Sequence, residues 1–232
     1  MEHSQIKLVL LPGMDGTGDL FADFVAALPC DLAAQVVGYP NDKFLSYSQL
    51  LELIDSRVPA SPYVVVAESY SSTVAIQFAA RHPPNLKGLV LSAGFATSPL
   101  RGWTRLLCRG LLPIMPWLPI PEIAAGLLFQ RKAPTSLQIR IRDAIRSAGP
   151  KVLRDRARAA LTCNVLEDLR AITVPVLYLQ ARYDSIVNRA CGEEIRSIRP
   201  DTRVVVLDGP HVLLQAMPRE TARIVTDFVR RL

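Results

Sequence analysis

The sequence contains few of the side chains that build metal sites and disulfide frameworks. It has three histidines and four cysteines in 232 residues, with no C-x-x-C pair and no Cys/His pair at zinc-binding spacing. We therefore expect no metal and no cofactor, and we expect the cysteines to be reduced thiols in the cytoplasm. The cysteines are Cys30, Cys108, Cys163 and Cys191.

Signals for export and for membrane spanning are also lacking. The N-terminal residues 1–4 have no basic segment, and the apolar run that follows is only as long as a strand. One longer apolar stretch, residues 106–129, is interrupted by four prolines and by Arg109 and Glu122, which a simple spanning helix would not tolerate. We expect no stable insertion into a membrane and a cytoplasmic location.

Short apolar, β-branched runs alternate with helical patterns along most of the chain. Almost continuously apolar strands separated by helices are typical of a parallel sheet covered on both faces, so the sequence predicts an α/β fold. Strands are expected at residues 6–11, 34–37, 63–67, 86–93, 176–180 and 203–207. Helices are expected at residues 21–28, 46–58, 72–81, 193–198 and 219–232.

One segment interrupts this alternation. Residues 97–166 are helical and rich in proline, show no strand pattern, and are far too numerous for a loop. We expect one domain, in which residues 1–96 and 167–232 form the catalytic core and residues 97–166 form an inserted helical cap.

A serine between a strand and a helix is the sharpest sign of chemistry. Ser69 follows the apolar run 64–67, and the small residues Ala67 and Ser71 flank it two positions before and after. A nucleophile elbow has this pattern, because a strained turn lifts the serine oxygen above the carboxyl edge of the sheet and small neighbours let strand and helix approach. The usual neighbours are glycines, and a serine here can instead serve only as a helix N-cap.

A serine nucleophile needs a base, and His211 is the best placed of the three histidines. It follows the strand at 203–207, in a loop at the carboxyl end of the sheet that can face Ser69. His3 lies near the N-terminus, and His82 lies at the foot of the helix that leaves Ser69, at the wrong end of the sheet. The alternative for His211 is a histidine of a surface loop.

An orienting carboxylate is expected at the carboxyl end of a strand, where Asp184 lies beyond residues 176–180. It would hold His211 in the required tautomer and stabilise the imidazolium. Asp201 precedes its strand and Asp208 occupies a turn position, so both fit less well. An ordinary helix cap is the alternative for Asp184.

The loop at residues 10–18 is rich in glycine. Its spacing is not G-x-G-x-x-G, and it has no P-loop lysine, so nucleotide binding is not indicated. The loop can instead supply an oxyanion hole, with the backbone N–H of Met14 beside that of Tyr70, the residue after Ser69. A tight turn without a ligand is the alternative.

The chain order of oxyanion loop, serine, aspartate and histidine resembles the α/β-hydrolase superfamily along nearly the whole chain. The resemblance implies that Ser69 is the nucleophile, that His211 is the general base and acid, and that Asp184 orients it. Met14 and Tyr70 would form the oxyanion hole.

Two departures from the superfamily pattern accompany this resemblance. Pro12 stands where a histidine is usual, and the chain starts at the superfamily's third strand. The resemblance therefore implies a minimal, mostly parallel six-stranded sheet. The loop and the elbow look most like small bacterial esterases and thioesterases, and the layout is similar to pimeloyl-carrier-protein methyl ester esterases.

The activity that this resemblance implies is cleavage of a carboxylic ester by a Ser–His–Asp triad through an acyl-enzyme. An acyl thioesterase or acyltransferase with the same triad is the alternative, and a non-catalytic ligand-binding protein of this fold is a third. Dehalogenases and epoxide hydrolases of this fold need an aspartate nucleophile, whereas this elbow carries Ser69.

The excess of positive charge is confined to the expected cap. The chain carries a formal +6, but residues 97–166 hold twelve Lys/Arg and three acidic residues, so this segment carries +9 and the rest −3. A helix face exposed to water is one interpretation. The other is a docking surface for an acidic partner such as an acyl carrier protein. Nucleic acid is not expected, because no aromatic stacking platform accompanies the arginines. The candidate binding residues are Arg142, Arg146, Arg154 and Arg158.

The first half of the expected cap is strongly apolar. We expect most of its large side chains to pack on the core and the others to line an acyl pocket over Ser69, which favours a medium or long acyl group or an apolar ester. These side chains are Leu106, Leu107, Leu111, Leu112, Ile114, Met115, Trp117, Leu118, Ile120, Leu127, Leu128 and Phe129.

Overall fold

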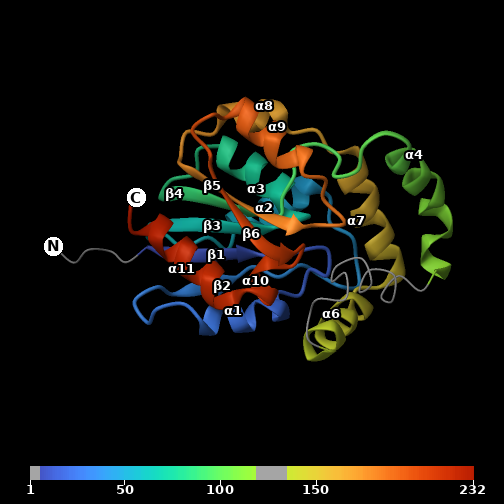
Figure 1. The fold of residues 1–232 in the computed structure, drawn as a ribbon, viewed down its shortest axis with the longest axis horizontal. Coiled ribbons are helices and arrows are strands. Elements are labelled where there is room, and N and C mark those ends of the chain that lie inside the picture. Colours follow the sequence, from blue (N-terminus) through green and yellow to red (C-terminus); the bar gives the residue numbers. More distant parts are fainter. Residues whose placement is uncertain (1–5, 119–134) are drawn as a thin grey trace.

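The computed structural model describes residues 6–118 and 135–232. Six strands form one sheet in the order β2-β1-β3-β4-β5-β6, and every neighbouring pair is parallel (Figure 1). The expected α/β class is confirmed, with a sheet that is wholly rather than mostly parallel. The strands are β1 (Lys7–Leu11), β2 (Ala34–Val36), β3 (Tyr63–Glu68), β4 (Leu86–Ser92), β5 (Val176–Tyr183) and β6 (Arg203–Pro210).

Helices cover both faces of the sheet, and each face has its own apolar core. Alternate residues of a strand point to opposite faces, so Val65 packs into one core and Val66 into the other. The first core receives side chains of α2 (Tyr47–Asp55), α3 (Ser71–Ala80), α8 (Leu166–Ala171) and α9 (Ala190–Ile198). The second receives those of α1 (Ala22–Ala26), α10 (Leu213–Ala216) and α11 (Pro218–Val229). Burial on both faces explains why the strands are so continuously apolar.

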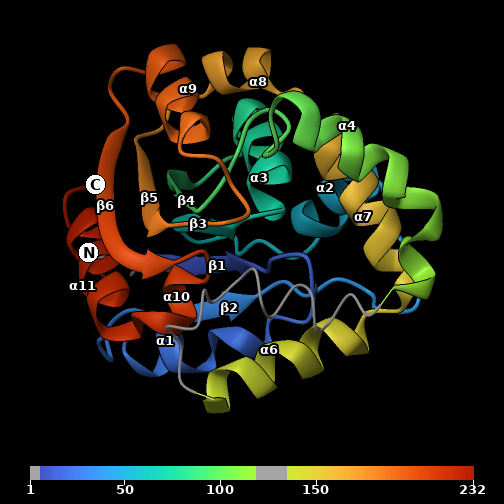
Figure 2. The same ribbon diagram turned by 45° about the vertical axis from the view of Figure 1, so that its right-hand side comes forward.

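The chain between β4 and β5 leaves the sheet and returns as helices. We call residues 97–166 the helical connection; at its two ends Thr97 and Asn164 form an isolated antiparallel bridge. Figures 1 and 2 show its helices beyond one end of the sheet. Its described elements are α4 (Gly102–Leu111), the 3-10 segment η2 (Leu112–Trp117), α6 (Thr135–Ser147) and α7 (Pro150–Thr162).

A third apolar cluster joins the helical connection to the rest of the molecule. Ile141 and Ile145 of α6 and Leu153 of α7 pack with Leu20, from the 3-10 turn η1 (Asp19–Phe21), and with Val212, which follows β6. The second half of the connection is therefore anchored next to the carboxyl ends of the strands. None of the helices in the described part of the chain has the length and apolar character needed to cross a bilayer.

The first half of the connection behaves differently from the sequence prediction. Its large apolar side chains were expected mainly to pack on the core, and for the described ones this is wrong, because only Leu112 is buried and Met115 partly packed. The helix α4 instead turns its polar side toward the protein, and Arg105 Nε donates to the Leu161 carbonyl over 3.1 Å. The exposed side chains are Leu106, Leu107, Leu111, Ile114, Trp117 and Leu118. Ile120, Leu127, Leu128 and Phe129 lie outside the described residues.

Candidate active site

The turn between β3 and α3 carries Ser69 in a strained conformation. Its φ is +49°, in the left-handed region that residues with a side chain seldom adopt. Small neighbours allow this turn: Ser72 is fully buried and packs so closely on Gly94 that a Cβ there would collide with the Ser72 side chain. The start of α3 thus lies close to the segment that follows β4, and the turn places the Ser69 side chain at the carboxyl edge of the sheet.

The serine that stands in place of the second usual glycine also makes contacts of its own. The Ser71 hydroxyl donates a short hydrogen bond to the Pro12 carbonyl, and the Tyr39 hydroxyl lies 2.6 Å from the Ser71 oxygen. All of these groups are buried or nearly so. Ser71 therefore ties the elbow to the loop that follows β1.

Three of the predicted site residues meet in one hydrogen-bonded chain. Ser69 Oγ lies 2.8 Å from His211 Nε2, and His211 Nδ1 lies 2.7 Å from Asp184 Oδ2. The other oxygen of Asp184 accepts the backbone N–H groups of Ile186 and Val187, each over 2.8 Å, so the carboxylate is held by its own loop. In this arrangement the imidazole can take a proton from the serine while the carboxylate steadies the resulting charge.

The surroundings of His211 shift its proton affinity. Burial lowers the pKa of His211, whereas the Asp184 carboxylate, its hydrogen bond and the nearby Glu68 raise it, so that the pKa lies above its usual 6.5. The imidazole is therefore a stronger base than one in water.

The other histidine and aspartates that the sequence analysis considered for the site have different partners. His82 Nδ1 lies 3.2 Å from the hydroxyl of Thr173, Asp201 pairs with Arg199 at 2.5 Å, and Asp208 pairs with Arg182.

The loop after β1 is held by contacts from two sides. Gly16 and Gly18 both have φ of +78°, which a glycine adopts without strain, and Asp15 Oδ2 accepts the Thr17 N–H and hydroxyl over 3.0 and 2.8 Å. From α7, Arg156 donates to the carbonyls of Met14 and Asp15 over 2.8 and 2.9 Å. A Cβ on Gly16 would lie 2.6 Å from that guanidinium, so only glycine leaves room for it.

The two predicted oxyanion donors lie near Ser69. Met14 lines the same pocket as Ser69, and Tyr70 is the N-cap of α3. The first N–H groups of a helix have no partner within the helix, and the helix dipole is positive at that end. An anion that develops above Ser69 would therefore meet a favourable field.

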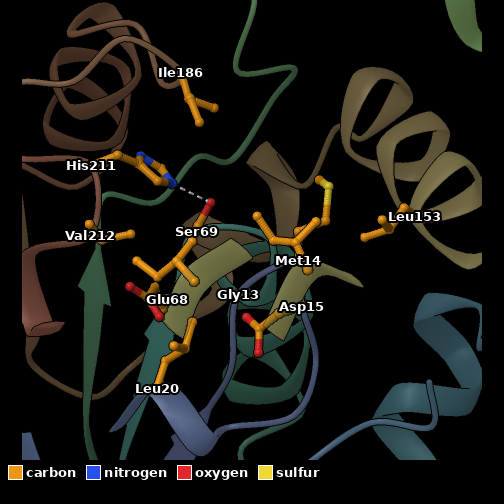
Figure 3. Close-up of a pocket in the computed structure, with 12 residues that line it drawn as sticks. Gly13, Met14, Asp15, Leu20, Glu68, Ser69, Leu153, Ile186, His211 and Val212 are labelled. Atoms are coloured by element: carbon orange, nitrogen blue, oxygen red, sulfur yellow. Dashed lines mark hydrogen bonds between the residues drawn. The ribbon is translucent and has the colours of Figure 1, made fainter. Parts of the chain in front are cut away.

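A cavity of about 130 Å³ opens at Ser69 (Figure 3). Its sheet-side wall includes Gly13, Ser69 and His211, and its other wall is formed by apolar side chains of α6 and α7. Such a pocket suits an apolar group attached to a reacting centre at Ser69. The apolar lining residues are Met14, Leu20, Ile141, Ile145, Leu153, Ile186 and Val212.

Two acidic residues, Asp15 and Glu68, also line this cavity. The pKa of Glu68 is raised to about 7, chiefly by burial and also by the nearby Asp15, while the hydrogen bond from Gln215 and the nearby His211 oppose the rise. Gln215 Nε2 donates to Glu68 Oε2 over 3.0 Å, but Oε1 is buried with no hydrogen-bond partner among the described residues. Glu68 therefore loses its proton near neutral pH, beside the hydroxyl of Ser69.

The predicted basic residues of the cap lie away from this cavity. Of the described residues that line it, none is an arginine. Arg142 and Arg146 lie on α6, and Arg146 is 4.0 Å from Asp143; Arg154 and Arg158 lie on α7, and Arg154 pairs with Asp155 at 2.9 Å. They form part of the surface of the connection, where an acidic partner would have to meet them.

Sequence reasoning missed two residues of the site. Arg156 was only one of twelve basic residues in the segment, and nothing in the pattern shows that it is 2% exposed and reaches the loop after β1. Glu68 did leave a signal, because it is a single acidic residue at the end of the apolar run 63–67, immediately before Ser69.

A wholly parallel sheet between two helix layers, with a serine elbow facing a histidine and an aspartate from later strand ends, defines the α/β-hydrolase class. The chain belongs to the Hydrolase_4 family, described as serine aminopeptidase, S33, whose family model matches residues 42–211. This match includes the elbow and all three members of the hydrogen-bonded chain.

Relatives of known sequence or structure agree with this class. A pimeloyl-[acyl-carrier protein] methyl ester esterase of Neisseria meningitidis is 24% identical over 238 residues, covering 96% of this chain and 93% of that protein. An esterase from Exiguobacterium antarcticum superposes with a TM-score of 0.86 at 15% identity, covering 98% of this chain and 92% of that one. The enol-lactonase of Burkholderia xenovorans LB400 gives 0.81 at 18% identity, covering 99% and 94%. The chain is thus a hydrolase by family, and the structural likenesses show a shared fold.

Proposed function

We propose that this hydrolase cleaves carboxylic esters through an acyl-enzyme, with Ser69 as nucleophile, His211 as base and acid, and Asp184 as the residue that orients His211. The observation that carries the proposal is the unbroken chain of contacts from Asp184 through His211 to Ser69, of 2.7 and 2.8 Å, at an apolar cavity. No metal or cofactor takes part in this mechanism.

In the first half-reaction, Ser69 Oγ attacks the ester carbonyl carbon while its proton passes to His211 Nε2. The tetrahedral intermediate collapses, the carbon–oxygen bond to the alcohol breaks, and His211 returns the proton to the leaving alcohol. In the second half-reaction, water attacks the acyl-Ser69 carbonyl and gives a proton to His211. Collapse of this second intermediate releases the acid and restores the Ser69 hydroxyl with that proton.

The oxyanion of both intermediates would be bound by the backbone N–H groups of Met14 and Tyr70. The peptide that carries the Met14 N–H lies between two anchored peptides. Ser71 binds the Pro12 carbonyl on one side and Arg156 binds the Met14 carbonyl on the other. Arg156 is therefore a positioning residue for the oxyanion hole.

The substrate that the cavity favours has an apolar acyl part. We propose that residues 97–166 act as a cap over a core made of residues 1–96 and 167–232, because Ile141, Ile145 and Leu153 supply the wall opposite Ser69. The Neisseria relative acts on a methyl ester carried by an acyl carrier protein, according to its name. A carrier-linked acyl methyl ester in the cytoplasm is the finer proposal, with the arginines of α6 and α7 facing the acidic carrier.

The test is turnover of p-nitrophenyl esters of increasing acyl length, alongside acyl thioesters of the same lengths and labelling by a fluorophosphonate. We expect ester turnover and labelling by the unmodified protein, and loss of both in Ser69→Ala. The matched control is Ser197→Ala, an exposed serine on α9, which should behave as the unmodified protein.

Each other outcome has a definite meaning. Faster release of thiols than of alcohols would indicate a thioesterase and not an esterase. A Ser69→Ala variant that keeps most of the activity would show that Ser69 is not the nucleophile. A protein that neither turns over esters nor reacts with the fluorophosphonate would be a ligand-binding member of the fold.

The carrier proposal needs its own variant. Arg142→Glu/Arg146→Glu/Arg154→Glu should weaken turnover of a carrier-linked ester at low salt and leave free p-nitrophenyl esters unaffected, because these arginines do not line the cavity. Equal rates on the carrier-linked ester for variant and parent would rule out docking through these residues.

Aminopeptidase activity is a second candidate, favoured by the two buried carboxyl groups. A Cβ on Gly13 would lie 3.5 Å from Asp15 Oδ1 and 3.8 Å from Glu68 Oε2, so both carboxyls approach one point of the cavity and could bind an ammonium group. Aminoacyl p-nitroanilides test this candidate: their turnover should be lost in Glu68→Gln, while ester turnover persists. If the protein turns over none of these anilides, aminopeptidase activity is excluded and esterase activity remains the proposed function.

A further inference from the structure

The helical connection exposes an unusual number of large apolar side chains. Seven large apolar residues between positions 103 and 118 are exposed, and Trp103 and Trp117 reach 72% and 80%. Patches of this kind mark surfaces that bind a partner or a membrane. We call this set the α4–η2 surface; it consists of Trp103, Leu106, Leu107, Leu111, Ile114, Trp117 and Leu118.

The helix α4 is oriented opposite to an ordinary surface helix. Trp103, Leu106, Leu107 and Leu111 follow helical spacing and share one face, yet no residue of this helix is buried. The polar side faces the protein instead, where Arg105 donates to the Leu161 carbonyl. In Figure 2, α4 lies at the outer edge of the molecule, next to α7. The apolar face is therefore directed outward by the packing of the protein itself.

Charge and residue type indicate what covers this surface. Residues 101–118 contain three arginines and no acidic residue. A helix with Trp and Leu on one face and arginines on the other has the pattern of helices that lie in the headgroup region of a membrane, where anionic lipids attract the arginines. Tryptophan suits that region because its ring is apolar and its N–H is polar, and both tryptophans of the chain are in this surface.

Charge argues against a second copy of the chain as the occupant. If two α4–η2 surfaces met, the arginines would lie behind the contact, but each surface would still approach a segment that has three arginines and no acidic residue of its own. Among the ion pairs of the described residues, only Arg101 of these three has an acidic neighbour, Glu194 at 3.1 Å. An anionic lipid surface removes that repulsion and replaces it with attraction.

We propose that the α4–η2 surface rests on the surface of an anionic lipid bilayer, with α4 parallel to the membrane plane. This is adsorption and does not require a helix that crosses the bilayer. The membrane would then lie beside α7, which contacts both α4 and η2 and also carries Leu153 into the wall of the cavity. The proposal stands independently of the reaction at Ser69.

The two tryptophans allow a direct test, because every change in tryptophan emission reports on this surface. Vesicles of phosphatidylcholine and phosphatidylglycerol in equal parts should shift the emission to the blue, and salt should reverse part of the shift. Pure phosphatidylcholine vesicles should produce a much smaller change. No shift with the anionic vesicles at low salt, or an equal shift with the neutral ones, would overturn the proposal.

Variants separate adsorption from other causes of a shift. Leu106→Ser/Leu107→Ser keeps both tryptophans and should weaken binding to anionic vesicles by at least roughly tenfold, given the apolar area that each leucine would bury. The matched control is Val206→Ser, which changes a side chain on β6 that is 43% exposed, and it should bind as the unmodified protein does. Unchanged binding by the double variant would contradict the proposal.

Occupants other than lipid have distinct signatures. A blue shift that depends on protein concentration without lipid, with a dimer in light scattering that Leu106→Ser/Leu107→Ser abolishes, would assign the surface to a second copy. A shift produced by an acidic acyl carrier protein and not by vesicles would assign it to that protein. Either result would replace the membrane proposal.

Discussion

The two walls of the cavity are built by different means. On the sheet side, Ser69, His211 and Asp184 lie at strand ends, and backbone groups hold Asp184 and the turn at Ser69. On the other side, α6 and α7 contribute only aliphatic side chains. The comparison teaches that the residues proposed to react are placed by the carboxyl edge of the sheet, while the shape of the cavity depends on helices inserted between β4 and β5. Arg156 is the exception, because it belongs to the helices yet holds the loop after β1.

The largest expected effect concerns the sheet side. Asp184→Asn should lower kcat by roughly 1,000- to 10,000-fold with little loss of folding, because an amide stabilises the wrong tautomer of His211 and does not support its positive charge. Steady-state kinetics and a thermal melt measure the two quantities. Asp208→Asn, which alters an exposed carboxylate paired with Arg182, is the control and should change kcat and the melting temperature very little. A small effect of Asp184→Asn on kcat would contradict the proposal that the residues at the strand ends carry out the reaction.

Arg156 tests whether the helical side also takes part in catalysis. Arg156→Met removes the hydrogen bonds to the Met14, Asp15 and Pro40 carbonyls, so the loop that carries the Met14 N–H should lose its fixed position. We expect kcat to fall by about 10- to 100-fold while KM changes little, since an oxyanion donor acts in the transition state.

Two further variants distinguish positioning from a general loss of stability. With free p-nitrophenyl esters as substrates, Arg156→Lys should restore part of kcat, and Arg158→Met, a change at an exposed neighbour on the same helix, should leave kcat unchanged because Arg158 does not line the cavity. If Arg156→Met raised KM and kept kcat, Arg156 would serve substrate binding instead.

The pH dependence of ester turnover measures how strongly the carboxylate acts on its partner. His211 must be neutral to accept the Ser69 proton, so kcat/KM should rise with pH and level off above the pKa of His211, which lies above 6.5. Below that pKa the rate should fall by about tenfold per pH unit. In Asp184→Asn the residual activity should level off at a lower pH, because the raising charge is gone. An unshifted profile would mean that Asp184 does not set the pKa of His211.

The smallest effect concerns stability and comes from Glu68. Its pKa of about 7 in the fold exceeds the ordinary 4.5, so the protonated form stabilises the native state. That contribution is complete below pH 4.5 and is lost as pH rises through 7. The side chain of the Glu68→Gln variant cannot ionise. The melting temperature of the variant minus that of the parent should therefore increase between pH 5 and pH 8, by on the order of 5 °C. Parallel melting curves across this range would show that Glu68 does not carry the shift.

Much of the sheet side could be predicted because its signals are local. Apolar runs of strand length predicted all six strands, and the small residues around Ser69 indicated a tight turn. The carboxyl ends of parallel strands meet at one edge, so His211 and Asp184 were expected near Ser69 although 142 and 27 residues separate the members of the two contacting pairs.

The helical side was predicted less well, because periodicity shows that a helix has an apolar face and does not show where that face points. Leu106, Leu107 and Leu111 were expected mainly to pack on the core, but Arg105 turns the polar side of α4 inward and leaves these leucines exposed. In the same way, the arginines at positions 154, 156 and 158 look equivalent in the sequence. Only the packing of α7 buries Arg156.

The sequence by itself determined the parallel sheet, the serine turn and the order of the acidic and basic partners along the chain, since each follows from the residues of one strand and its next turn. The tertiary structure alone decided that Arg156 anchors the loop after β1, that Glu68 is buried with Gln215 as its hydrogen-bond partner, and that the apolar face of α4 points outward. These depend on contacts between segments far apart in the chain, such as the 142 residues between Arg156 and Met14. Burial in those contacts raises the pKa of Glu68, and it distinguishes the buried Arg156 from Arg154 and Arg158 on the same helix.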